Sequence, residues 1–117
     1  MTKRYRLDAS EFRTLVVGHG FCLASDHITV DGMRVGFMYR EEPDSSDDSG
    51  WVFLSGLESQ EYLDEPSNLA LYDLNTIANY DPAIVPFLED PVGSAYGRDP
   101  GEPEFRLESM PDHLRDH

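Results

Sequence analysis

Residues 21–40, FCLASDHITVDGMRVGFMYR, decide the fold class of this chain. The apolar run Phe21–Ser25 is typical of a buried strand, and His27–Val30 continues it with β-branched residues. The dipeptide Asp-Gly at 31–32 is a strong hairpin signal, because the turn it favours needs a positive φ that glycine adopts without strain. Apolar and polar side chains then alternate through Met33–Arg40. The stretch therefore predicts an antiparallel hairpin.

Outward from this stretch, strands come first and short helices follow. We expect a strand at Trp51–Ser55, ended by Gly56, and a helix that Asp73 caps and that runs to Tyr80. The pattern favours an α+β fold, a single domain with a mainly antiparallel sheet and a few short helices. The other expected elements are a short helix within 5–17, one or two helical turns in 58–65, a strand at 69–72, a helix that starts at 81–82, and closing strands at 94–97 and 104–108.

The chain has 117 residues, the length of one domain. We expect an N-terminal extension at 1–20, the α+β domain at 21–108 and a polar C-terminal tail at 109–117. No apolar run resembles a signal peptide or approaches the roughly 20 residues of a membrane span. One cysteine, Cys22, permits no internal disulfide, which fits a reducing compartment. A cytoplasmic protein is expected.

Charge is distributed unevenly along the chain. The formal net charge is −14, and the segment from Glu41 to Gly97 contains thirteen acidic residues and no Lys or Arg. Such a surface repels nucleic acid and anionic membranes and attracts cations or basic proteins. Solubility alone would also explain an acidic composition, but ordinary solvated surfaces intersperse charges of both signs. We therefore expect a basic protein partner, with no nucleic acid and no membrane.

No pattern in the chain indicates catalysis. Cys22 next to His19 or His27 is the one imaginable nucleophile pair, but an apolar strand is the usual place of a buried, inert thiol. The nucleophile elbow, the phosphate-binding loop, the zinc-protease helix and the dinucleotide fingerprint are all missing from the sequence. We expect a protein that is not an enzyme and has no cofactor.

The loop from 41 to 50 permits an alternative. Its carboxylates could bind a hard divalent cation such as calcium or magnesium, although their spacing does not match an EF-hand. A solvated turn in which Asp and Ser side chains accept backbone hydrogen bonds explains the same residues.

The residues around the single tryptophan are the best candidates for partner contacts. Trp51 and Tyr62 flanked by acids would suit a partner that carries Arg or Lys, whereas Trp51 as a core residue is the simpler interpretation. The candidate partner-binding residues are Glu41, Glu42, Asp44, Asp47, Asp48, Trp51, Glu58, Glu61 and Tyr62.

Four segments, 39–44, 48–62, 72–82 and 93–97, resemble the immunity-protein-33-like family of bacteria. The resemblance covers roughly residues 21–108 and leaves the first twenty outside. It implies a protein from a polymorphic-toxin system, in which an immunity protein binds a cognate toxin and blocks it, and it brings no catalytic residues. The expected function is therefore neutralisation of a cognate toxin through an acidic surface. The alternative is a small ligand- or metal-binding protein that uses the 41–50 loop. An unpaired closing strand at 104–108 would permit dimerisation without requiring it.

Overall fold

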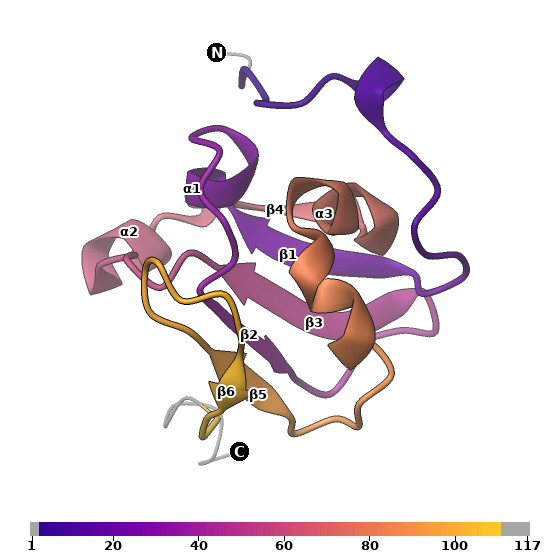
Figure 1. The fold of residues 1–117 in the computed structure, drawn as a ribbon, viewed down its shortest axis with the longest axis vertical. Coiled ribbons are helices and arrows are strands. Elements are labelled where there is room, and N and C mark those ends of the chain that lie inside the picture. The colour runs from indigo at the N-terminus through magenta and orange to yellow at the C-terminus, as the bar shows by residue number, and fades with distance from the viewer. Residues whose placement is uncertain (1–2, 111–117) are drawn as a thin grey trace.

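The structure is a computed structural model that describes residues 3–110, so most of the expected C-terminal tail lies outside the described residues. Its centre is a six-stranded sheet in the order β4-β1-β3-β2-β5-β6 (Figure 1). β1 and β3 run parallel, and the other four neighbouring pairs are antiparallel. The expected α+β fold with a mainly antiparallel sheet is confirmed. The strands are β1 (Phe21–Ser25), β2 (Phe37–Arg40), β3 (Asp48–Leu54), β4 (Leu69–Asp73), β5 (Ala95–Gly97) and β6 (Arg106–Leu107).

Short helices cover one face of this sheet. α3 and the 3₁₀ helix η3 lie across β1 and β3, and α2 lies near the end of β3 (Figure 1). Side chains from alternate strand positions, such as Cys22, Met38 and Phe53, form the main core under these helices. The helices are η1 (Ala9–Glu11), α1 (Asp26–Thr29), α2 (Gln60–Asp64), η2 (Pro66–Asn68), α3 (Leu74–Tyr80) and η3 (Pro82–Phe87).

The opposite face of the sheet is less covered. Tyr39, Val52 and Ala95 form a smaller cluster there, against which Met110 packs. Toward β4 the face opens, and Leu71 is 66% exposed. The apolar side chains near β4 are therefore accessible to solvent.

The predicted hairpin within 21–40 is wrong. The chain after β1 forms helix α1, and its C-terminal end is closed by backbone hydrogen bonds from Gly32 to Ile28 and from Met33 to His27. Gly32 does adopt a positive φ of 77°, but it does so where a helix ends, the other common place for such a glycine. β2 pairs with β3 and β5 and does not contact β1 as a neighbour.

The predicted helix within 5–17 is reduced to the single 3₁₀ turn η1. We call residues 5–17 the strap, which passes outside α3 before it enters β1 (Figure 1). Its backbone bonds to side chains of α3: Arg13 N donates to Asn79 at 2.8 Å, and Leu15 N donates to Asn75 at 2.7 Å. Because these distant amides satisfy its peptide groups, the strap stays extended.

One ion pair is buried within the fold. The side chains of Asp81 and Arg98 are 9% and 3% exposed and bond to each other directly. Asp81 also accepts from Val35 N at 2.9 Å, and Arg98 donates to Val35 O at 2.9 Å and to Pro103 O at 3.1 Å. The guanidinium lies 4.2 Å above the Phe105 ring. The pair thus connects the segment before β2, the start of η3, the end of β5 and the segment before β6.

Asp81→Asn should destabilise the protein strongly, because it leaves the Arg98 guanidinium buried without its counter-ion. Loss of one partner of a buried pair costs about 3–5 kcal/mol, and we expect a decrease of that order in the free energy of unfolding in urea. The control is Asp99→Asn, which removes a carboxylate from an exposed contact with Arg106 and should leave the midpoint close to that of the wild type. Equal midpoints for the two variants would contradict this role of the pair.

Candidate functional site

Three acidic residues lie where β1 and β3 begin and β4 ends. Phe21 lies opposite Asp48 on β3 and opposite Asp73 on β4, so both residues flank it. Asp47 precedes Asp48, and its carbonyl accepts a hydrogen bond from Phe21 N at 2.8 Å. Asp47 and Asp73 are exposed, and Asp48 is half-buried. We call Asp47, Asp48 and Asp73 the carboxylate edge.

The loop that leads into β3 is shaped by the Asp48 side chain. Its two carboxylate oxygens accept from Gly50 N at 2.9 Å and from Asp44 N at 3.0 Å. Glu41 N donates to Gly50 O at 2.9 Å and closes the loop from the β2 side. A Cβ on Gly50 would lie 2.2 Å from Glu41 O, so this approach requires glycine. The loop therefore has a defined shape, with Asp44 and Asp47 exposed.

Negative charge at this end of the sheet affects neighbouring groups. Burial raises the pKa of the Tyr39 hydroxyl to about 12, and the nearby Glu41 carboxylate contributes to the increase. Burial also raises the pKa of the Cys22 thiol, and Asp73 and Asp48 raise it further. The carboxylate edge thus creates a region of negative potential around the start of β1.

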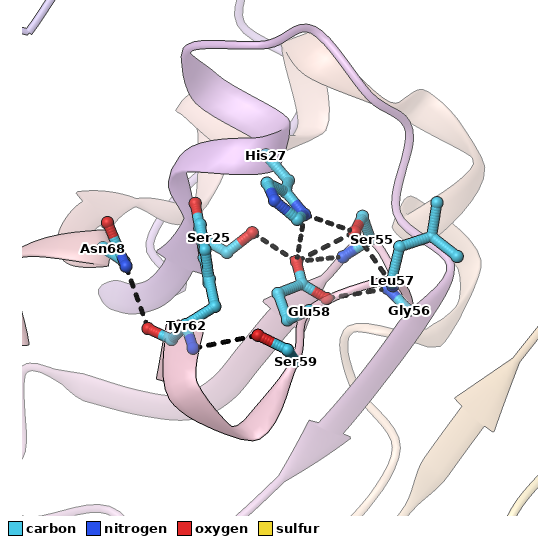
Figure 2. Close-up of polar contacts among 9 residues, drawn as sticks. All are labelled: Ser25, His27, Ser55, Gly56, Leu57, Glu58, Ser59, Tyr62 and Asn68. Atoms are coloured by element: carbon cyan, nitrogen blue, oxygen red, sulfur yellow. Dashed lines mark hydrogen bonds and ion pairs between the residues drawn. The ribbon is translucent and has the colours of Figure 1, made fainter. Parts of the chain in front are cut away.

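The opposite end of β3 has a different polar cluster, centred on Glu58 (Figure 2). Glu58 Oε2 accepts from Ser25 Oγ at 2.5 Å, from Ser55 N at 2.8 Å and from Ser55 Oγ at 2.9 Å, while Oε1 accepts from Gly56 N at 3.0 Å. Burial alone would raise the pKa of the Glu58 carboxyl, but the hydrogen bonds from Ser25 and Ser55 outweigh it and lower the pKa. Glu58 therefore joins the end of β1 to the turn that follows β3.

His27 contacts this cluster without forming a catalytic triad. Its Nδ1 lies 3.0 Å from Ser55 Oγ and 3.4 Å from Glu58 Oε2, so one ring nitrogen faces both groups. In a serine–histidine–acid triad the two ring nitrogens have different partners. The His27 ring instead packs against Tyr62, with their centroids 4.2 Å apart (Figure 2). This geometry is that of a structural polar cluster.

The imagined cysteine–histidine pair is not assembled either. Cys22 is 0% exposed and its Sγ donates to Tyr72 O at 3.5 Å. The Nδ1 of His19 contacts a backbone carbonyl instead. A buried thiol with a raised pKa has little thiolate, so Cys22 behaves as a core residue.

The structure divides the nine expected partner-binding residues between the two ends of β3. This strand has seven residues, so its ends lie about 20 Å apart. Trp51 lies between them in the core. The residues of the amino end are Glu41, Glu42, Asp44, Asp47 and Asp48, and those of the carboxyl end are Glu58, Glu61 and Tyr62.

For two of the nine residues, the expectation of surface contact is corrected. Trp51 is 1% exposed, donates from Nε1 to Leu88 O at 3.0 Å and stacks on Phe53. The Glu58 side chain is 2% exposed and its oxygens are occupied by the hydrogen bonds described above. Both side chains are therefore buried and make their contacts within the protein.

Two surface residues of the amino end were missed by sequence reasoning. Phe21 belongs to a strand expected to be buried, yet it is 48% exposed. Asp73 is the expected cap of α3, and it does accept from Asn75 N at 2.8 Å, but it also lies opposite Phe21. Only the sheet register brings these two distant positions together. The one available signal is an acid that follows directly on the apolar run Leu69–Tyr72.

The acidic loop 41–50 is the candidate cation site of the sequence. Nowhere in residues 3–110 do three His, Cys, Asp or Glu side chains lie close enough together to hold a metal ion. Both oxygens of Asp48, the central carboxylate of the loop, accept backbone N–H groups. The described part of the chain thus presents dispersed carboxylates.

Comparison with known proteins supplies one match. The model of the Immunity protein Imm33 domain matches residues 22–107. No curated protein and no solved structure matches significantly. Within residues 3–110, no helix is long and apolar enough to cross a membrane.

Glu58→Gln should remove a pH-dependent part of the stability. Because the folded-state pKa of Glu58 is lowered, its contribution is present above the usual glutamate value of about 4.3 and is lost as the pH falls below it. At neutral pH we expect the free energy of unfolding in urea to fall by about 1–3 kcal/mol relative to the wild type. This difference between variant and wild type should become smaller in acid. Glu61→Gln, on the exposed side of α2, is the matched control. Identical behaviour of both variants at neutral pH would refute the structural role of Glu58.

Cys22 should not react with Ellman's reagent in the folded protein at about pH 8, because it is fully buried and its pKa is raised. Release of one thiol equivalent should appear only after unfolding in guanidinium chloride. Rapid, stoichiometric labelling of the native protein would show that the thiol is accessible.

Proposed function

Because the chain belongs to the Imm33 immunity protein family, we propose that it binds a cognate protein toxin and blocks it through the carboxylate edge. The observation that carries this proposal is the grouping of Asp47, Asp48 and Asp73 around one exposed aromatic residue, Phe21. An immunity role needs a complementary surface and no chemistry of its own. The polar clusters and the cysteine of this chain fit that requirement, since they are engaged in the fold.

The chemistry of the edge indicates the kind of surface it would bind. Phe21 is 48% exposed and Val17, just before the turn into β1, is 77% exposed. An apolar side chain surrounded by charges resembles the centre and rim of a protein interface. The partner surface that fits is therefore apolar at its centre with Lys or Arg around it.

Charge would act mainly on the rate of capture. No Lys or Arg occurs from Glu41 to Gly97. The neighbouring Arg40 side chain bonds to the carbonyls of Ser49 and Asp90. A field of one sign raises the association rate with an oppositely charged protein and loses its effect as salt is added.

Identification of the partner is the first test. A tagged pull-down from the native cell at low salt, followed by mass spectrometry, should recover one stoichiometric basic protein that raised salt releases. Expression of that protein alone should stop growth, and co-expression of this chain should restore growth. A partner that does not harm the cell would argue against neutralisation.

Charge removal at the edge tests the surface. The triple variant Asp44→Asn, Asp47→Asn, Asp73→Asn spares Asp48, whose oxygens shape the loop, and changes its exposed neighbour Asp44 instead. It should slow association with the toxin at low salt by at least about tenfold and flatten its salt dependence. Asn can still cap α3 at position 73, so the fold should persist. Association is measured by surface plasmon resonance at several salt concentrations.

The matched control removes the same charge at the far end of the sheet, by Glu61→Gln, Asp64→Asn and Glu65→Gln. Its association rate should stay close to that of the wild type. Equal effects of both triples would mean that only total charge matters, and the carboxylate edge would not be the binding surface.

A further inference from the structure

The edge strand β4 has backbone groups available for pairing. Among the residues that the structure describes, it lies at one end of the sheet and pairs only with β1. An antiparallel ladder uses the peptide groups of alternate residues, so the remaining groups point away from β1. Leu74 N donates to Gly20 O, so in this register Ala70 and Tyr72 bond to β1, and the N–H and C=O of Leu71 point outward. Within residues 3–110, no backbone group pairs with Leu71 on that outer side.

Apart from its last residue, Asp73, β4 also lacks the usual protection of an edge strand. Proteins commonly place charges or proline on exposed edges, or keep those edges very short. The run from Leu69 to Tyr72 has neither, and Leu71 is 66% exposed. The opposite edge, β6, has two residues, and Arg106 on it bonds to Asp99 and Glu102. The two edges of the sheet therefore differ in how readily they accept another strand.

An apolar groove runs beside this unprotected edge. Its volume is about 390 Å³. β4 and α3 form its floor, and the strap forms its outer wall. The residues that line it are Leu71 and Tyr72 of β4, Thr76 and Tyr80 of α3, and Tyr5, Leu7 and Phe12 of the strap.

The wall of the groove is held by specific contacts. Asn75 and Asn79 each donate to Arg13 O, at 2.9 and 2.8 Å, and accept from strap N–H groups. At the other end, Leu7 N donates to the Tyr80 hydroxyl at 3.1 Å. The strap lies outside the matched residues 22–107, so the wall is an addition to the family domain.

We propose that an extended segment of the partner protein pairs with the outer side of β4 and inserts an apolar side chain into the groove. Strand addition of this kind takes affinity from backbone hydrogen bonds and specificity from pockets for alternate side chains. The inference deepens the proposed function and rests on it, because it names the part of the toxin that is bound. The strap then selects the side chain that enters.

Charge favours a foreign segment over a second copy of this chain. Two copies would each carry a net charge of −14 and repel one another. Asp73 ends β4 and is exposed, so it would attract a Lys or Arg at the end of the added segment. Asp73 also belongs to the carboxylate edge, which makes the groove continuous with the proposed toxin surface.

The test uses a phage-displayed library of random peptides, selected on the full chain. Leu71→Lys protects the edge with a charge, and Thr76→Phe fills the groove. Leu107→Lys is the matched control, since Leu107 is 80% exposed on the opposite edge strand. Selected peptides should combine an apolar residue with a Lys or Arg. Their affinity should fall roughly 30-fold or more with either groove variant and stay within about threefold with the control.

Hydrogen exchange provides a second readout that does not depend on substitution. The bound peptide should slow exchange of the outward amide of Leu71, while the amides of Ala70 and Tyr72, which face β1, serve as internal references. Failure to select peptides, or selected peptides that bind Leu71→Lys and Thr76→Phe normally, would overturn the inference. A wild-type dimer that Leu71→Lys dissociates would assign the edge to a second copy and also overturn it.

The outcomes separate this inference from the proposed function. Peptide selection needs no toxin, so peptides bound at β4 together with failed rescue of growth would refute toxin neutralisation alone. Restored growth with a toxin whose affinity the groove variants do not alter would refute the groove alone.

Discussion

The buried pairing of Asp81 with Arg98 is the interaction on which the arrangement of this chain depends. Asp81 begins η3, and Arg98 follows β5 directly, so the two charges link the helical layer to the far half of the sheet. Their hydrogen bonds to the Val35 backbone also hold in place the segment that leads into β2. A buried charge without its partner is strongly destabilising, so these segments are stable only when all of them meet. Arg98 is the first base after Arg40, and it is used inside the protein.

Local signals predicted the elements whose causes lie within a few residues. Asp73 and Asp81 cap helices, and the strand that contains Trp51 ends before Gly56. The predictions that were wrong concern elements whose structure depends on residues far away in the sequence. The positive φ of Gly32 was expected from its dipeptide, but whether it closes a hairpin or a helix depends on which strand becomes the neighbour of β1. The strap is extended because it meets Asn75 and Asn79, more than fifty positions away.

The candidate surface could be predicted only in part for a related reason. Composition located the acids, but it did not separate carboxylates that bond within the protein from those that face solvent. Glu58 accepts several N–H and O–H groups and Asp48 accepts two backbone N–H groups, whereas Asp47 and Asp73 are exposed. The parallel pairing of β1 with β3 then decides which acids share one end of the sheet. Without knowledge of this register, the sequence suggests one continuous acidic surface. In the fold, the acidic residues lie at two separate ends of the sheet.

Asp73 connects the two surfaces for which binding is proposed. It is the last residue of β4, the cap of α3 and a member of the carboxylate edge, so the charged surface and the apolar groove meet at this residue. Interactions of the two kinds act at different stages of association. Exposed charges act over several ångströms and raise the rate of encounter, while strand pairing and a filled pocket act on contact and slow dissociation. A toxin inhibitor that captures its target quickly and retains it needs both stages, and the two surfaces proposed here for this chain lie side by side. In the proposed role, the acidic surface would account for fast capture, and slow release would depend on the apolar run Leu69–Tyr72 of β4.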